Sequence, residues 1–156
     1  MAIHTLHRTA VLQTTLENAW TFFTDPRNLT RITPPGLGFQ IVTDVPERIY
    51  AGLMIEYRVR PLLGIPLTWL TEITHVSDGE YFVDEQRRGP YTLWHHEHWF
   101  RALPDGRVEM EDRVTYAPPL GPLGTLVHPL LIRPQLEKIF THREKLMADL
   151  FPRGDP

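Results

Sequence analysis

The sequence contains no cysteine, so disulfides and thiolate chemistry are excluded, and any bound metal would need histidine or carboxylate ligands. No stretch approaches the ~20 apolar residues of a membrane-spanning helix, and the first residues lack the apolar run of a signal peptide. A net charge of −3 provides no basic face for nucleic-acid phosphates. These absences predict a cytoplasmic protein with no stable membrane insertion and no nucleic-acid partner.

The chain has 156 residues, of which 42% are hydrophobic and 22% are charged. This length suits one domain with one core, and this composition is typical of a chain that folds. We therefore expect a single domain over residues 1–156.

The hydrophobic pattern predicts an α+β fold. We expect a first strand over residues 3–13 and a short helix carrying Leu16, Ala19, Trp20 and Phe23 at helical spacing. A second short helix should begin after Asp25 with proline in its first turn. Six further strands are expected at residues 39–45, 53–60, 67–76, 81–86, 91–103 and 107–117. A long amphipathic helix over residues 135–150 should cover one face of this antiparallel sheet of about seven strands.

The stretch WHHEHWF, Trp94 to Phe100, places three histidines and a glutamate between aromatic residues. The following LPDGR sequence is typical of a three-residue hairpin loop, which would place Leu103 opposite Arg107. Because Val108, Met110 and Val114 mark the inner face of the next strand, side-chain alternation turns one set of residues toward the concave interior. This inner set is Trp94, His96, His98, Phe100, Asp112 and Tyr116; His95, Glu97 and Trp99 should face outward.

A second turn, at Asp78-Gly79, is typical of a two-residue hairpin loop that pairs Ser77 with Glu80. This register would place one further set on the inner face: Trp69, Thr71, Ile73, His75, Phe82, Asp84 and Gln86. An error of one residue in either turn would invert part of the assignment.

The wider connections after Arg60, Arg87 and Ala117 should lie together at the opposite end of the sheet. They carry Leu62, Leu63, Leu120 and Leu123, with Arg87 and Arg88 nearby. Apolar residues beside cations suit the entrance for an amphipathic or anionic ligand. Alternatively, these leucines pack on one another and on the long helix.

The chain resembles the START-like, Bet v 1-like (SRPBCC) superfamily, and within it a bacterial group of ligand-binding domains related to polyketide cyclases/dehydratases and lipid carriers. The resembling stretches are ITPPG from Ile32, GIPLTWLTEI from Gly64, FVDEQRRGPYTLWHHEHWF from Phe82 and EDRVTYAPPLGPLG from Glu111. The resemblance implies the helix-grip fold, with a cavity between the sheet and the C-terminal helix. It implies no catalytic residues.

Three functional hypotheses follow. The first is binding, for carriage or sensing, of a small hydrophobic or amphipathic molecule with a polar head. The second is an enzyme of the cyclase/dehydratase type, in which His98 acts as base and Asp112 orients it. The third is a protein-interaction module; a homodimer is also compatible with the sequence. Whether the chain is an enzyme stays open, although no nucleophile motif accompanies the His–Asp pair.

We predict nine ligand-binding residues: Trp69, Phe82, Gln86, Trp94, His96, His98, Phe100, Asp112 and Tyr116. A two-histidine, one-carboxylate metal site at His96, His98 and Asp112 is a weaker alternative, because His98 and Asp112 can simply satisfy each other. We expect no metal and no cofactor.

Overall fold

The computed structural model describes residues 2–60 and 64–152. The strands are β1 (His4–Leu12), β2 (Gln40–Ile41), β3 (Met54–Val59), β4 (Leu67–Ser77), β5 (Tyr81–Arg88), β6 (Leu93–Ala102) and β7 (Val108–Ala117). The α-helices are α1 (Leu16–Phe23), α2 (Gly121–Val127) and α3 (Arg133–Leu150). Two 3₁₀ helices, η1 (Pro26–Arg31) and η2 (Pro35–Leu37), follow α1, and a π-helical turn, η3 (His128–Ile132), joins α2 to α3.

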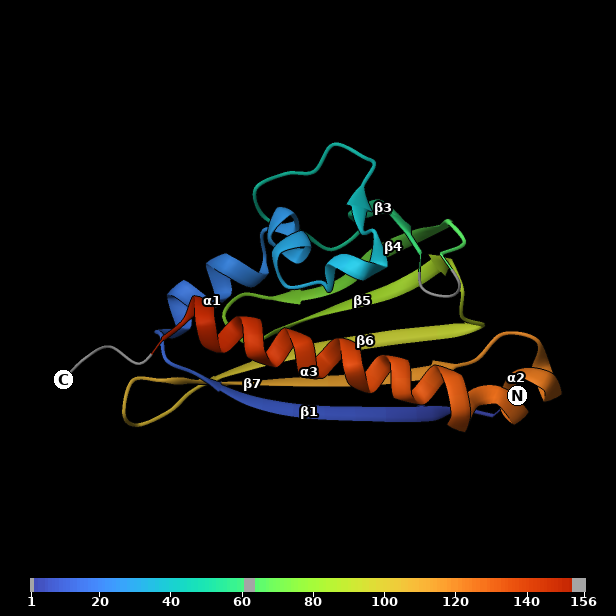
Figure 1. The fold of residues 1–156 in the computed structure, drawn as a ribbon. Coiled ribbons are helices and arrows are strands. Elements are labelled where there is room, and N and C mark those ends of the chain that lie inside the picture. The colour runs from blue at the N-terminus through green and yellow to red at the C-terminus, as the bar shows by residue number, and fades with distance from the viewer. Residues whose placement is uncertain (1, 61–63, 153–156) are drawn as a thin grey trace.

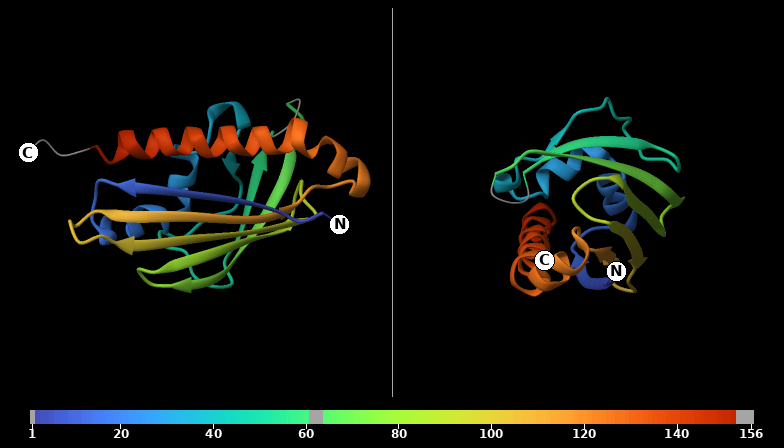
Figure 2. Two further views of the ribbon diagram at one scale, coloured as in Figure 1. Left: turned by 90° about the horizontal axis from the view of Figure 1, so that it is seen from below. Right: turned by 90° about the vertical axis from the view of Figure 1, so that its right-hand side faces the viewer.

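All seven strands form one antiparallel sheet in the order β1-β7-β6-β5-β4-β3-β2. The sheet curves around α3, which lies along its concave side (Figures 1 and 2). The predicted helix-grip fold, with two short helices after the first strand, is therefore confirmed. No helix among the described residues is both long enough and apolar enough to cross a membrane.

The hairpin between β6 and β7 has the predicted register. Leu103 N–H donates to Arg107 O at 2.8 Å, and Gly106 has a φ of 82°, as the bulge in this turn requires. His98 consequently pairs with Asp112, and Trp94 with Tyr116. The inward direction of His96 and His98, and the outward direction of His95, were thus correctly predicted from this turn and the apolar pattern of the next strand.

The hairpin between β4 and β5 differs from its prediction. Ser77 pairs with Tyr81 rather than Glu80, because the loop between β4 and β5 has three residues instead of two. A β-bulge between Ile73 and His75 then restores the predicted register for the rest of the two strands. Asp84 and Gln86 therefore lie opposite Ile73 and Thr71, as expected. His75 was wrongly predicted to face inward: the bulge turns it outward and it is exposed.

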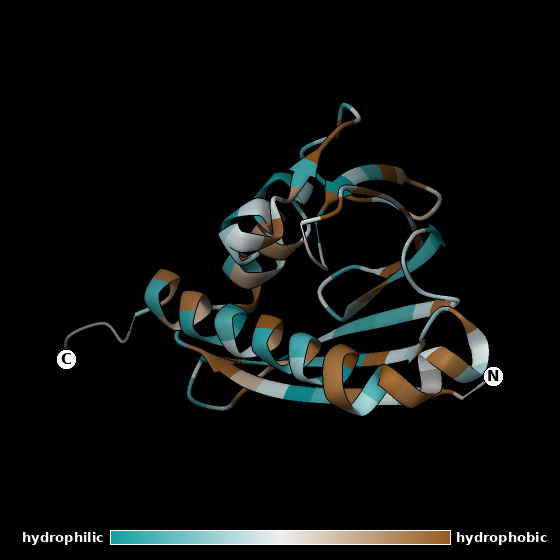
Figure 3. Ribbon diagram, turned by 45° about the vertical axis from the view of Figure 1, so that its right-hand side comes forward, coloured by the Kyte–Doolittle hydropathy of each residue, from teal (hydrophilic) through white to brown (hydrophobic). Residues whose placement is uncertain are grey.

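The segment before α3 was expected to be a connection, and it is helical instead. The helix α2 begins at Gly121, and the π-turn η3 accommodates Pro129 before α3 begins. Pro129 and Pro134 lie in the first turns of η3 and α3, where a residue without a backbone N–H is tolerated. Six large aliphatic side chains on this segment are exposed, and Figure 3 shows its hydrophobic colouring: Leu120, Leu123, Leu126, Val127, Leu130 and Leu131.

Two apolar clusters fill the concave side of the sheet. The larger one joins α1 to β3, β5 and β6 through side chains such as Trp20, Ile55 and Phe100. The smaller one joins β6 and β7 to α3 through Trp94, Tyr116, Leu136 and Phe140. The helix α3 is amphipathic, and its buried residues are Leu136, Phe140 and Met147. Burial of its apolar stripe, rather than its intrinsic helix propensity, holds α3 against the sheet.

Candidate functional site

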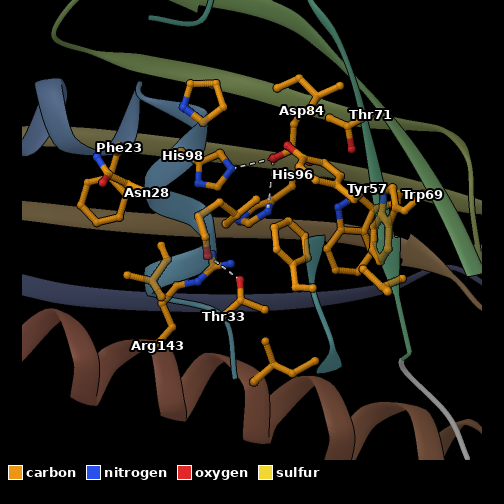
Figure 4. Close-up of a pocket in the computed structure, with 18 of the residues that line it drawn as sticks. Phe23, Asn28, Thr33, Tyr57, Trp69, Thr71, Asp84, His96, His98 and Arg143 are labelled. Carbon is orange, nitrogen blue, oxygen red and sulfur yellow. Dashed lines mark hydrogen bonds and ion pairs between the residues drawn. The ribbon is translucent and has the colours of Figure 1, made fainter. Parts of the chain in front are cut away.

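A cavity of about 180 Å³ lies between α3, the concave face of the sheet and the segment from α1 to η2. Most of its lining is aromatic or aliphatic, and Figure 4 shows these side chains around the polar groups. The apolar lining includes Phe23, Leu29, Ile55, Trp69, Phe82, Trp94, Ile139 and Phe140. The polar lining from the sheet includes Tyr57, Thr71, Asp84, His96 and His98, and α3 adds Arg143. The cavity is thus a mainly apolar space with one polar wall.

The polar wall is built from three neighbouring central strands. Asp84 on β5 is opposite His96 on β6, and Asp112 on β7 is opposite His98 on β6. Because residues two apart on a strand share a face, both imidazoles point the same way, and their ring centroids are only 3.7 Å apart. The four side chains form what we call the His–Asp cluster.

Each histidine of the cluster lies between the two carboxylates. His98 Nε2 donates to Asp84 Oδ2 at 2.7 Å, and His96 Nε2 donates to Asp112 Oδ1 at 3.0 Å. The other contacts are weaker: His96 Nδ1 is 3.5 Å from Asp84 Oδ2. His98 Nδ1 is 3.0 Å from Asp112 Oδ1 but is not aligned for a hydrogen bond, and it has no hydrogen-bond partner among the described residues. The predicted His98–Asp112 pair is therefore a close contact, while the hydrogen bond of His98 goes to Asp84.

Burial and mutual attraction oppose each other in the cluster. Burial raises the pKa of Asp112, but the hydrogen bonds and charges of His96 and His98 outweigh burial, and the pKa of Asp112 lies far below its usual range. Burial likewise raises the pKa of Asp84, yet the two imidazoles, with a smaller contribution from Arg143, bring that pKa below its usual range. Both carboxyl groups are therefore ionised at neutral pH.

The two imidazoles of the cluster differ from each other. Burial and the neighbouring charge of His98 lower the pKa of His96. Burial also lowers the pKa of His98, but the close contact with Asp112 and the hydrogen bond to Asp84, together with their negative charges, outweigh it, so the pKa of His98 is raised. A proton on the cluster is thus held by His98, while His96 stays neutral.

Two polar groups face the cluster across the cavity. Arg143 projects from α3 toward the cluster (Figure 4), its guanidinium carbon lies 5.0 Å from the Phe140 ring centroid, and its buried Nε has no hydrogen-bond partner among the described residues. Burial, together with the charge of Asp84, raises the pKa of Tyr57, so its hydroxyl is a neutral donor. Both groups can contact a polar ligand head.

Five of the nine predicted ligand-binding residues line the cavity: Trp69, Phe82, Trp94, His96 and His98. Asp112 lies behind the histidines, where it accepts from His96 and is 5% exposed. Phe100 belongs to the core beside α1, with its ring 5.4 Å from that of Trp20. The strand register correctly predicted that these side chains face inward, but it does not define how far each one lies below the cavity surface.

The other two predicted residues are engaged elsewhere. Gln86 closes its own loop, because its side chain donates to Tyr91 O at 2.7 Å and accepts from Tyr91 N–H at 3.2 Å. The hydroxyl of Tyr116 is hydrogen-bonded to His128 Nε2 at 2.7 Å, which ties η3 to β7. Whether any of the nine residues contacts a ligand stays a prediction.

The predicted entrance differs from the observed cavity lining. Leu120 and Leu123 are exposed as expected, but neither of them lines the cavity, nor do Arg87 and Arg88. Arg87 is paired with Glu72 and Glu85 on the outer side. The predictions for Leu62 and Leu63 fall outside the described residues. Instead, Asn28, Leu29, Ile32, Thr33 and Leu37 of the η1–η2 segment line the cavity.

Sequence reasoning missed three polar contributors to the site. Asp84 was placed on the inner face but not chosen, and Tyr57 was not considered. Arg143 had a usable signal, because it is a charged residue on the apolar side of a helix that otherwise shows leucine, isoleucine and phenylalanine.

Asp84, His96 and His98 can each offer one ligand atom, and these atoms lie within 4.8 Å of one another. The metal-ligating set suggested by the sequence was His96, His98 and Asp112. The structure brings Asp84 into this set and places Asp112 behind it, because Asp84 is the carboxylate on the cavity side.

No family model and no curated protein matches the chain. Solved structures match it over almost its whole length. Protein CV1439 from Chromobacterium violaceum has a TM-score of 0.71 at 14% identity, covering 97% of this chain and 98% of that chain. A START superfamily protein from Mycobacterium smegmatis has a TM-score of 0.67 at 13% identity, covering 94% and 99%. A point mutant of norcoclaurine synthase from Thalictrum flavum, in complex with a transition-state analogue, has a TM-score of 0.65 at 13% identity, covering 96% of each chain.

These likenesses show the fold. The chain has the helix-grip fold, which it shares with the START superfamily protein, as its sequence resemblance implied. The finer resemblance, to a bacterial ligand-binding group within that superfamily, stays a prediction.

Proposed function

We propose that the protein binds a small, largely apolar organic molecule with a polar head, for carriage or sensing, in the cavity between α3 and the sheet. The observation that supports this proposal is the cavity itself, which combines a mainly apolar lining with a few polar groups on one wall. Ligand sites typically have this composition, with apolar surface for affinity and sparse polar groups for orientation.

The size of the cavity limits the part of the ligand that it holds. A volume of about 180 Å³ exceeds what a few waters need, and an engineered apolar cavity of roughly 150 Å³ accepts benzene. One ring or a short branched chain therefore fits between Trp69, Phe82 and Phe140. A larger ligand would need α3 or the η1–η2 segment to move outward.

The polar head of the ligand should lie at the His–Asp cluster. Asp84 is the most exposed member, with 18% of its side chain accessible, and it can accept a hydrogen bond from a hydroxyl or amine. Tyr57 and Arg143 can donate to a carbonyl or carboxylate, and no hydrogen bond among the described residues engages the Tyr57 hydroxyl or the Arg143 guanidinium. A head that both donates and accepts suits this wall.

The proposal can be tested with salicylate, a fluorescent probe that has one aromatic ring and a polar head and therefore matches the cavity volume. Ile139→Trp should fill the cavity and weaken probe binding by about tenfold or more, because Ile139 lines the cavity on α3. Lys138→Trp, at the adjacent exposed position, is the matched control and should leave the affinity unchanged. Thermal unfolding should verify that both variants fold.

Equal probe affinity in the wild type and in folded Ile139→Trp would contradict the proposal, since the probe would then bind elsewhere, for example on the exposed leucines of α2. Native mass spectrometry of protein purified from cells supplies an independent measurement. A bound molecule that is present with the wild type and lost with Ile139→Trp would support the proposal.

The His–Asp cluster favours a second candidate, an enzyme that performs acid–base chemistry of the cyclase/dehydratase type. A buried imidazole oriented by carboxylates beside an apolar cavity is the arrangement such chemistry needs, and one structural neighbour is a synthase. A dehydration should lower the mass of a bound molecule by one water with time in the wild type and not in His98→Asn. A cyclisation keeps the mass, so it should be followed as a change in the chromatographic retention of the extracted molecule. No change in mass or retention in either protein would favour simple binding.

A further inference from the structure

Three possible metal ligands meet at one point of the cavity wall. His98 Nε2 and His96 Nδ1 lie 2.7 Å and 3.5 Å from the same oxygen, Asp84 Oδ2. In a tetrahedral site, ligand atoms 2.0–2.2 Å from an ion are roughly 3.3–3.6 Å apart. The 3.5 Å separation matches this range, the 2.7 Å separation would have to lengthen, and all three ligand atoms lie within 4.8 Å of one another.

The second ring nitrogen of each histidine faces the carboxylate of Asp112. His96 Nε2 and His98 Nδ1 each lie 3.0 Å from Asp112 Oδ1. Histidines that bind metals commonly present their second nitrogen to a carboxylate, which orients the ring and increases its basicity as a ligand. Asp112 is buried behind the rings, where it can serve both histidines in this way.

One contact in the His–Asp cluster, between His96 Nδ1 and Asp84 Oδ2, is not a hydrogen bond. His96 donates to Asp112 through Nε2, so in the neutral ring Nδ1 carries a lone pair. This lone pair lies 3.5 Å from an oxygen of Asp84. In this neutral ring, Nδ1 thus lies beside the same carboxylate oxygen that His98 Nε2 contacts, and an ion bound there would contact all three ligand atoms.

The geometry points to a binding site for one divalent transition-metal ion, formed by Asp84, His96 and His98, with Asp112 orienting both histidines. Two imidazoles and one carboxylate suit Zn²⁺ or Fe²⁺ better than Mg²⁺ or Ca²⁺, which prefer oxygen ligands. The ligands come from paired central strands, so the site is preorganised. Since three protein ligands leave coordination positions open, water or a ligand head in the cavity could occupy them.

The test uses the full chain without a histidine tag, treated with chelator and then dialysed. Titration calorimetry with Zn²⁺ should show one site with a dissociation constant of about micromolar or tighter. Asp84→Ala and His98→Ala should weaken binding about 100-fold or more, and Asp112→Asn about 10–100-fold. The matched control is His95→Ala, which removes the neighbouring histidine on the outer face of β6 and should leave Zn²⁺ binding unchanged.

Absence of Zn²⁺ binding by the wild type would overturn the proposal, as would equal affinity in the Asp84→Ala and His98→Ala variants. A loss in His95→Ala as large as in His98→Ala would also overturn it. A second measurement needs no variant: Co²⁺ bound to the wild type should show visible absorption bands typical of mixed nitrogen and oxygen ligation, and their absence contradicts the site. The site is independent of the proposed function, because the fluorescent probe can be titrated in the presence of chelator.

Discussion

The two faces of β6 carry similar residues in opposite environments. On the outer face, His95 Nδ1 lies 2.8 Å from Glu85 Oε1, and 32% of the His95 side chain is accessible. On the inner face, the side chains of His96 and His98 are 5% and 9% accessible and contact two carboxylates. The same imidazole–carboxylate pairing thus occurs on both sides of one strand.

This difference in exposure determines what each pair contributes. Water and salt screen the outer pair, so it stabilises the fold by less than about 1 kcal/mol. The inner side chains have lost most of their hydration, and only the hydrogen bonds and opposite charges of their partners offset the free-energy cost of that loss. Removing one inner partner therefore has a much larger effect than removing one outer partner. Buried groups held in this way are also the ones that can be positioned for a ligand or an ion.

The largest effect should come from Asp112→Ala. This change removes the acceptor of His96 and the close contact of His98, so that of the two carboxylates of the cluster only Asp84 remains beside the buried imidazoles. We expect the free energy of unfolding to fall by about 3 kcal/mol, measured by urea unfolding at pH 7. The outer-face control, Glu97→Ala, removes the acceptor of Trp99 Nε1 and should cost less than about 1 kcal/mol. Similar losses in the two variants would show that burial does not separate the two faces.

A smaller effect is expected from Tyr116→Phe, which tests a buried pair that carries no charge. It removes the hydrogen bond to His128 Nε2 and leaves that nitrogen without its partner. The free energy of unfolding should fall by about 1–2 kcal/mol, and hydrogen exchange should become faster in η3. A decrease as large as that for Asp112→Ala would mean that charge adds nothing to the cost of an unpaired buried group.

The smallest effect concerns an exposed ion pair at the start of η1. Asp25 accepts from Arg27 Nε at 2.8 Å and from Arg27 N–H at 3.0 Å. The hydrogen bond from Arg27 lowers the pKa of Asp25. Because the pKa is lower in the folded state, the pair stabilises the protein above the unfolded pKa of about 3.9 and loses this contribution as the pH falls through the folded pKa.

Asp25→Asn keeps a capping side chain but removes the charge. We expect it to lower the free energy of unfolding by less than about 1 kcal/mol at pH 7 and low salt, after allowance for solvent screening. The difference from the wild type should shrink at high salt and as the pH falls through the folded pKa of Asp25. A difference that depended on neither salt nor pH would show that the charge is not its origin.

Local turn chemistry explains why much of the site was predictable. The LPDGR loop admits one favoured register, which placed His98 opposite Asp112, and the apolar residues Val108, Met110 and Val114 then identified the face of His96 and His98 as the inner one. The loop at Asp78-Gly79 was less informative. Its turn shifts the pairing of β4 with β5 by one residue from the predicted register, and a β-bulge further along the strands shifts the pairing back. Such a bulge depends on packing along both strands, so the turn residues do not reveal it.

Other parts of the site depend on contacts between segments far apart in the chain. Arg143 approaches Asp84 only because α3 lies across the sheet, and the η1–η2 segment lines the cavity only because it packs near the same helix. Asp84, and not Asp112, faces the cavity because β5 contributes to the cavity lining, whereas no described residue of β7 does.

Strand alternation and turn geometry are local properties, so the sequence by itself determined the order of the strands, the long C-terminal helix and the inward direction of His96 and His98. The helix-grip fold followed from the resemblance to a known superfamily. The tertiary structure alone decided that each histidine is held between two carboxylates, and that Asp84 faces the cavity while Asp112 lies behind. The physical reason for this difference between Asp84 and Asp112 is the curvature of the sheet around α3, which sets the depth of each inward-facing residue and thus its contact with water, a ligand or an ion.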